Sequence, residues 1–99
     1  MSIKKQFLKS KPECKVTFNI QIKEAKTVGV AGSFNNWEAQ TMPLRKIKNG
    51  TFKGSYNIPT NNSYEFKYCV DGKSWINDNG ADKYVWNDYA ASENGLLEL

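Results

Sequence analysis

The sequence contains no histidine, and it has only two cysteines and three prolines among its 99 residues. The lack of histidine removes the commonest general base and the commonest metal ligand in proteins. The two cysteines, Cys14 and Cys69, are too far apart in the chain to form a zinc site by their spacing. No glycine-rich phosphate loop is present either. We therefore predict a protein that is not an enzyme and that uses no cofactor and no metal.

Four aspartates are the remaining candidates for acid–base chemistry, because a pair of carboxylates can hydrolyse a glycosidic bond. They are Asp71, Asp78, Asp82 and Asp88. A hydrolase also needs a cleft that encloses its substrate, and a chain of this length has few residues to form one in addition to its core. Asp71 is better explained by its neighbour Gly72, since Asp-Gly is a strong signal for a hairpin turn. We therefore disfavour a hydrolase.

Long apolar runs are also absent, and none approaches the length that is needed to cross a bilayer. Residues 1–15 are basic like the start of a signal peptide, but no apolar segment follows them. We expect no membrane association and a cytoplasmic location, in which Cys14 and Cys69 are reduced thiols. A disulfide between them stays open, because pairing depends on a geometry that the sequence does not give.

Positive charge is concentrated in the first quarter of the chain. Residues 1–26 hold seven lysines and two glutamates, a net charge of +5, whereas the whole chain carries +4. We expect residues 1–12 to form a basic arm and residues 13–99 to form a single domain. A solvated, lysine-rich edge that discourages strand-to-strand aggregation explains the arm. Contact with nucleic acid or with an acidic surface is the weaker alternative.

Alternation of apolar and polar residues is the commonest pattern in the chain. In residues 14–22, CKVTFNIQI, the apolar side chains share one face, and residues 63–70, SYEFKYCV, repeat the pattern. Further short strands are expected at residues 28–32, 51–58, 73–76 and 95–99. Only residues 3–9 suggest a helix, which is too short to be stable alone. The pattern predicts an all-β fold, either a β-sandwich or a small barrel. Its predicted core residues are Val16, Phe18, Ile20, Phe66 and Tyr68.

Three tryptophans, Trp37, Trp75 and Trp86, lie in or beside segments that are rich in Asn, Asp, Gly and Ser. The C–H face of a pyranose packs flat on an indole, while its hydroxyl groups need Asn, Lys, Ser and backbone partners. One stacked ring buries roughly 60 Å² of apolar surface, which is worth about 1.5 kcal/mol. Two or three tryptophans spaced along a chain of sugars can therefore form a usable weak site. Core packing is the competing interpretation of each tryptophan alone, because tryptophan is usually largely buried.

Three segments together resemble a known family: VGVAGSFNNWEAQTMPLRK at 28–46, YEFKYCVDGKSW at 64–75 and ASENGLLEL at 91–99. They are similar to carbohydrate-binding module family 48, the early-set domain of isoamylases, branching enzymes and the β subunit of AMP-activated protein kinase. The similarity covers residues 16–99 and includes small free-standing bacterial proteins of this type. It implies an immunoglobulin-like (early-set) antiparallel β-sandwich of about seven strands. It also implies binding of α-1,4-linked glucan with no catalysis.

The resemblance implies a set of carbohydrate-binding residues as well. Trp37 matches the tryptophan that closes the GSFNNW-type loop of the family and stacks on glucose. Lys67 matches a lysine that bonds to sugar hydroxyls. Trp75 matches the second stacking tryptophan, although the turn before it is one residue longer here. Ser92 and Asn94 correspond to the final threonine and asparagine of the family's site.

The loop of Trp37 is expected to hold the indole outward, because its polar residues do not suit a core and Gly32 would let the backbone turn sharply. Two departures from the family pattern affect the rim of the site. Ala90 stands near the position of a leucine that fits against the sugar, and Trp86 stands where bacterial relatives have a proline. Trp86 either replaces a sugar contact or covers the core, and the sequence leaves both open.

Two functions from different classes follow from these features. The first is non-catalytic binding of glycogen-like or starch-like α-glucan, with that glucan and a glycogen-metabolising enzyme as partners. The second is a protein-interaction domain of the same fold that has lost its sugar site, which the small Ala90 and the lack of an attached catalytic domain favour. The retained Trp37, Lys67 and Trp75 favour the first. Nucleic acid is not expected as a partner, because the lysines are not interleaved with enough exposed aromatic residues.

Overall fold

The computed structural model describes residues 2–78, 80–88 and 91–99, and nearly all of its regular structure is β-strand. The strands of this part of the chain are β1 (Ser2–Phe7), β2 (Glu13–Gln21), β3 (Val28–Gly32), β4 (Pro43–Lys46), β5 (Thr51–Pro59), β6 (Ser63–Val70), β7 (Ser74–Ile76), β8 (Lys83–Asn87) and β9 (Ser92–Glu98). Two single-turn 3₁₀ segments, η1 (Ala39–Thr41) and η2 (Lys48–Gly50), lie on either side of β4. The expected all-β fold is confirmed, with nine described strands in place of about seven. No described helix is long and apolar enough to cross a membrane.

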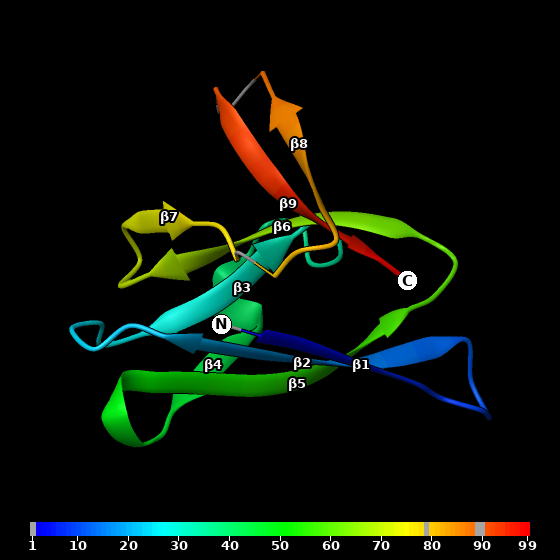
Figure 1. Cartoon of the computed structure of the whole chain (residues 1–99), viewed down its shortest axis with the longest axis horizontal. Coiled ribbons are helices and arrows are strands. Elements are labelled where there is room, and N and C mark those ends of the chain that lie inside the picture. Colours follow the sequence, from blue (N-terminus) through cyan, green and yellow to red (C-terminus); the bar gives the residue numbers. More distant parts are fainter. Residues whose placement is uncertain (1, 79, 89–90) are drawn as a thin grey trace.

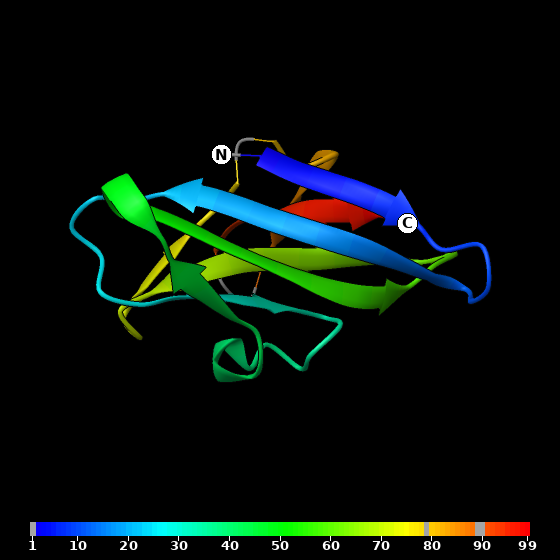
Figure 2. The same cartoon turned by 90° about the horizontal axis from the view of Figure 1, so that it is seen from below.

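All strand pairs are antiparallel and form one curled sheet, in the order β1-β2-β5-β4-β3-β6-β9-β8 with β7 also paired to β6. The sheet curls into two layers, with β1, β2 and β5 facing β3, β6 and β9 (Figure 1). β4 joins the layers, because its first half pairs with β3 and its second half with β5. In the view from below, β1, β2 and β5 lie in front of the other layer (Figure 2). The arrangement is that of an antiparallel β-sandwich.

The hydrophobic core lies between the layers, where inward side chains of β2 meet those of β6. The ring centroid of Phe18 lies 5.9 Å from that of Phe66 and 6.3 Å from that of Tyr68. All five predicted core residues are fully buried, which confirms the prediction. Because successive residues of a strand point to opposite sides, the residues between them face outward.

Turn residues end several strands where the sequence places them. Asn49 and Gly50, between β4 and β5, have φ angles of 59° and 71°. Asn61, between β5 and β6, has a φ of 63°. Glycine and asparagine tolerate this left-handed region better than other residues do. These turns therefore follow directly from local sequence.

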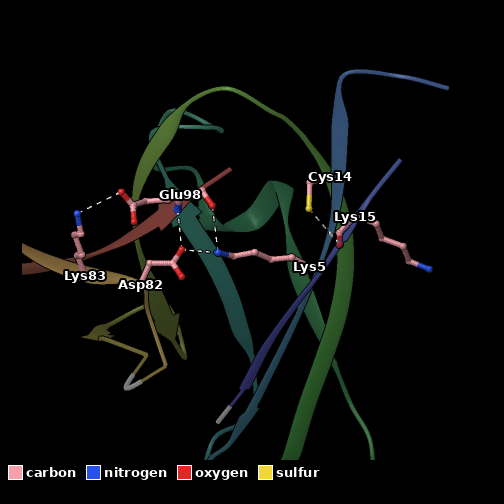
Figure 3. A network of polar contacts seen from close by, with 6 residues as sticks. All are labelled: Lys5, Cys14, Lys15, Asp82, Lys83 and Glu98. Atoms are coloured by element: carbon pink, nitrogen blue, oxygen red, sulfur yellow. Dashed lines mark hydrogen bonds and ion pairs between the residues drawn. The ribbon is translucent and has the colours of Figure 1, made fainter. Parts of the chain in front are cut away.

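β1 corrects the suggestion of a helix at residues 3–9. Its six residues pair with β2 along their whole length, as the outermost strand of the sheet. The edge of β2 offers unpaired backbone groups along this stretch, whereas a helix of seven residues would have nothing to stabilise it. Ile3 packs against the core. Lys5 reaches across the sandwich to the carboxylate of Asp82, with 2.6 Å between Nζ and Oδ2, and to the carbonyl oxygen of Glu98 (Figure 3).

Candidate functional site

A groove of about 460 Å³ opens on the outward side of the second layer, between the loop after β3 and the β6–β7 hairpin. Trp37 lines it from the loop, and Trp75 lines it from β7. Its other lining residues are Thr27, Val28, Gly29, Ala39, Gln40, Pro43, Cys69 and Gly72. The structure therefore places the two tryptophans that were expected to stack on sugar in one cavity.

The cysteines lie on different sides of the sheet. Cys14 is buried in the core, whereas Cys69 is partly exposed in the groove, and both thiols are free. The expectation of two reduced thiols stays a prediction, and the placement of the cysteines on different sides of the sheet agrees with it.

The loop that carries Trp37 is held by a side chain that the sequence analysis did not single out, Asn35. Asn35 makes four side-chain hydrogen bonds that tie the end of β3 to η1. Its partners are Gly32 N (2.9 Å), Val30 O (2.9 Å), Glu38 O (3.2 Å) and Thr41 Oγ1 (3.2 Å). The amide uses both its acceptor and its donors here, which only Asn or Gln can do. The position of Trp37 is therefore fixed by its own loop.

The backbone turn that presents the indole is made by Asn36 and Trp37, whose φ angles are 55° and 60°. The expectation that Gly32 makes this turn is wrong, because Gly32 is not in the left-handed region. Glycine is needed there for close approach to β6, since a Cβ would lie 2.5 Å from the carbonyl oxygen of Glu65. Trp37 itself is partly buried and is not part of the core of the described chain.

Trp75 is presented by the β6–β7 hairpin and is 49% exposed. The turn consists of Asp71 and Gly72, with φ angles of 53° and 68°, as a type I′ turn requires. Oδ1 of Asp71 accepts hydrogen bonds from the backbone N–H groups of Thr27 (2.8 Å) and Lys26 (2.7 Å). These two bonds lower the pKa of Asp71. The carboxylate thus ties the hairpin to the segment before β3.

The predicted polar residues lie beside the groove on the outward side of β6 and β9. Nζ of Lys67 donates to Oγ of Ser92 at 2.7 Å. Nδ2 of Asn94 donates to Oε1 of Glu65 at 3.0 Å. Lys67 and Glu65 are on the same side of β6 as Cys69, which lines the groove. Alternate residues of a strand are about 7 Å apart, so Lys67 lies next to the groove. The structure therefore brings Lys67, Ser92 and Asn94 together.

Asn94 differs from the other predicted site residues in its burial. It is only 3% exposed, and its amide group is held by Glu65. In this structure Asn94 therefore orders the polar cluster more than it faces solvent. Glu65 was missed by the sequence analysis, although its place on the polar side of β6 is a signal that it lies next to Lys67.

Trp86 faces away from this cluster. In the register of β8 with β9 it lies opposite Glu93, the neighbour of Asn94, and neighbouring residues point to opposite sides. Trp86 is 63% exposed, so it does not cover the core. Its Nε1 donates to Oδ1 of Asp88 at 2.7 Å. Ala90, the other departure from the family pattern, lies outside the described residues.

Two of the other aspartates considered for acid–base chemistry, Asp78 and Asp82, connect separate segments of the fold. Asp78 is fully buried and accepts a 2.5 Å hydrogen bond from the hydroxyl of Tyr68. Burial, reinforced by this bond, raises the pKa of Tyr68. Asp82 is only partly buried, and although burial opposes its ionisation, the N–H of Glu98 and the charge of Lys5 lower its pKa. Among the described residues no group of His, Cys, Asp or Glu could hold a metal ion.

The site as a whole combines apolar, flat surfaces with hydrogen-bonding groups on one side of the sheet. The two indoles offer stacking faces, and the Lys67–Ser92 pair offers a cationic donor and a hydroxyl nearby. A ligand with apolar faces and hydroxyl groups at its edge fits this chemistry.

One protein-family model matches the chain. Its description is the glycogen recognition site of AMP-activated protein kinase, and it covers residues 14–96. All five predicted site residues lie within that range. None of the curated proteins compared with the chain matches it.

Proposed function

Because this chain belongs to the family of the glycogen recognition site of AMP-activated protein kinase, we propose that it binds α-1,4-linked glucan and catalyses no reaction on it. The observation that supports this most is that Trp37 and Trp75 line a single groove. Glycogen-like and starch-like chains are the ligands. A glycogen-metabolising enzyme in the cytoplasm is the partner that we expect such a module to serve.

In this proposal glucose rings stack on the two indoles. Each stacked ring contributes about 1.5 kcal/mol, so two rings contribute about 3 kcal/mol. A millimolar complex needs about 4 kcal/mol, and hydrogen bonds must supply the rest. Lys67 is suited to this role, because an ammonium group has three donors and Ser92 uses one of them. The proposed binding residues are Trp37, Lys67, Trp75, Ser92 and Asn94, with Asn94 acting through its bond to Glu65.

The experiment compares three alanine variants by calorimetric titration with maltoheptaose. Trp37→Ala and Trp75→Ala should each weaken binding by about 1–2 kcal/mol, or roughly tenfold, because each removes one stacking face. Trp86→Ala is the matched control, since this indole is exposed on the opposite side of its hairpin. It should bind like the parent protein. All three should unfold near the temperature of the parent.

Four results would contradict the proposal. A parent protein that does not bind maltoheptaose or β-cyclodextrin would leave the protein-interaction domain as the better interpretation. Full binding by both groove variants, or equal weakening by Trp86→Ala, would place the site elsewhere. A Trp37→Ala protein that melts far below the parent would make Trp37 a structural residue, since truncation of a buried tryptophan costs about 3–5 kcal/mol.

A further inference from the structure

The first layer of the sandwich has a charged outer surface that the glucan site does not use. Alternation along β1, β2, β4 and β5 sends one set of side chains inward and the other outward. Four exposed cations lie on the outward side, which we call the basic face: Lys4, Lys15, Arg45 and Lys53. Figure 2 looks onto this layer from outside. Glu13, at one end of β2, is the only carboxylate that alternates to the same side.

The four cations stand apart from the other charged residues that the structure describes, because none of them is paired there. No hydrogen bond or ion pair of their side chains is present within the described residues, in contrast to Lys5 and Lys83, which pair with Asp82 and Glu98 (Figure 3). Nine of the ten acidic residues of the chain lie off this face. The charges of the basic face are therefore available to a partner.

Two of the cations are placed in a way that opposes folding. Arg45 of β4 and Lys53 of β5 are direct cross-strand partners on the same side of the sheet. Like charges directly opposite each other destabilise a sheet. On the far side of Lys53 the cross-strand neighbour is Asn19, which is neutral and does not relieve the repulsion. An unrelieved local conflict of this kind is expected where a surface serves a function.

The neighbours of the cations indicate what kind of partner fits. The outward positions between them carry hydrogen-bonding side chains: Gln6, Thr17, Asn19, Ser55 and Asn57. The aromatic residues of these strands all alternate to the other side: Phe7, Phe18, Phe52 and Tyr56. Single-stranded nucleic acid needs aromatic stacking platforms, and duplex readers insert a helix or ribbon into a groove. A flat, basic, non-aromatic sheet face meets neither need, whereas it suits spaced carboxylates.

We propose that the basic face docks on an acidic surface of a partner protein. The partner would bind on one side of the sandwich while the groove of Trp37 and Trp75 stays open on the other. The surface does not depend on the glucan proposal. Because recognition is electrostatic, complex formation is sensitive to salt.

The experiment uses labelled poly-L-glutamate as the acidic probe, at low ionic strength, with fluorescence anisotropy as the readout. The double variant Arg45→Gln/Lys53→Gln should bind about tenfold more weakly than the parent, the scale of losing two exposed ion pairs. The control variant Lys26→Gln/Lys73→Gln removes the same charge at the other face and should change affinity less than about threefold. The test variant should also melt at a higher temperature than the parent, because the cross-strand repulsion is gone.

Lys4→Gln/Lys15→Gln is a second test pair, which keeps the proposal testable if the first variant fails to fold. Equal weakening by the control pair would mean that net charge alone attracts the probe, and that result overturns the proposal. Unchanged binding by both test pairs overturns it too. Tighter binding of duplex DNA than of poly-L-glutamate, lost in the same test variants, would make the partner a nucleic acid. The two test pairs should bind maltoheptaose like the parent. This result separates the test of the basic face from the test of the groove.

Discussion

Replacement of Asn35 tests how the structure holds Trp37 in the groove. Asn35→Ala removes four hydrogen bonds, at 2.9, 2.9, 3.2 and 3.2 Å, and leaves the backbone N–H of buried Gly32 without its acceptor. A neutral bond contributes about 1 kcal/mol net, and an orphaned buried N–H costs about 1–3 kcal/mol. Since the two longer bonds are weaker, we expect the free energy of unfolding to fall by about 2–4 kcal/mol. Glucan affinity should fall about tenfold, because the indole is no longer held in place.

Asn35→Asp sharpens the test. The carboxylate keeps an acceptor for Gly32 N–H but turns an oxygen toward the carbonyl groups of Val30 and Glu38, so it should be at least as damaging as alanine. Asn36→Asp is the matched control, because Asn36 is exposed and has no side-chain hydrogen bond among the described residues. Urea unfolding should place the control within about 0.5 kcal/mol of the parent. If Asn35→Asp unfolds and binds glucan like Asn36→Asp, the side chain of Asn35 does not hold the loop.

Three further predictions concern the core, acid stability and salt. Tyr68→Phe should cost about 1–3 kcal/mol in urea unfolding, because Asp78 is then buried without its hydroxyl donor; an unchanged midpoint would contradict this. The pKa of Asp82 is lower in the folded protein than in the unfolded chain, so its contribution to stability is present above about pH 3.9 and is lost as the pH falls through the folded pKa. When the melting temperature is plotted against pH, Asp82→Asn should therefore lose less stability at acid pH than the parent. An equally steep loss would refute a stabilising contribution of the ion pair between Lys5 and Asp82. Maltoheptaose affinity should hardly change between low and moderate salt, because the ligand is neutral and releases no counterions; a steep salt dependence in calorimetry would point to a polyanionic ligand.

Local sequence predicted much of the fold, because strand alternation and turn chemistry are properties of a few neighbouring residues. The side of each residue in β2 and β6 follows from the period of 2, which assigned Phe18 and Phe66 to the core and Lys67 to the outer side. The Asp71–Gly72 turn follows from the positive φ that its type requires. The prediction of one site with Trp37 and Trp75 rested on the family resemblance. The spacing of the two residues in the sequence does not show whether their side chains lie close together in the fold.

Other features depend on which segments meet, and no local pattern carries that information. The strand at Ser2–Phe7 forms because the edge of β2 is free, and Gly32 is required because the carbonyl of Glu65 comes within reach of its Cα. The β8–β9 register turns Trp86 away from Lys67.

By itself, then, the sequence determined which residues alternate, where the chain turns and which side chains can stack or donate, because short-range sterics and side-chain chemistry suffice for these. Only the tertiary structure decided that Trp37 and Trp75 line one groove, that Asn94 is buried against Glu65, and that Arg45 lies opposite Lys53. Each of these is a contact between distant segments, and it exists only once the register of the whole sheet has formed.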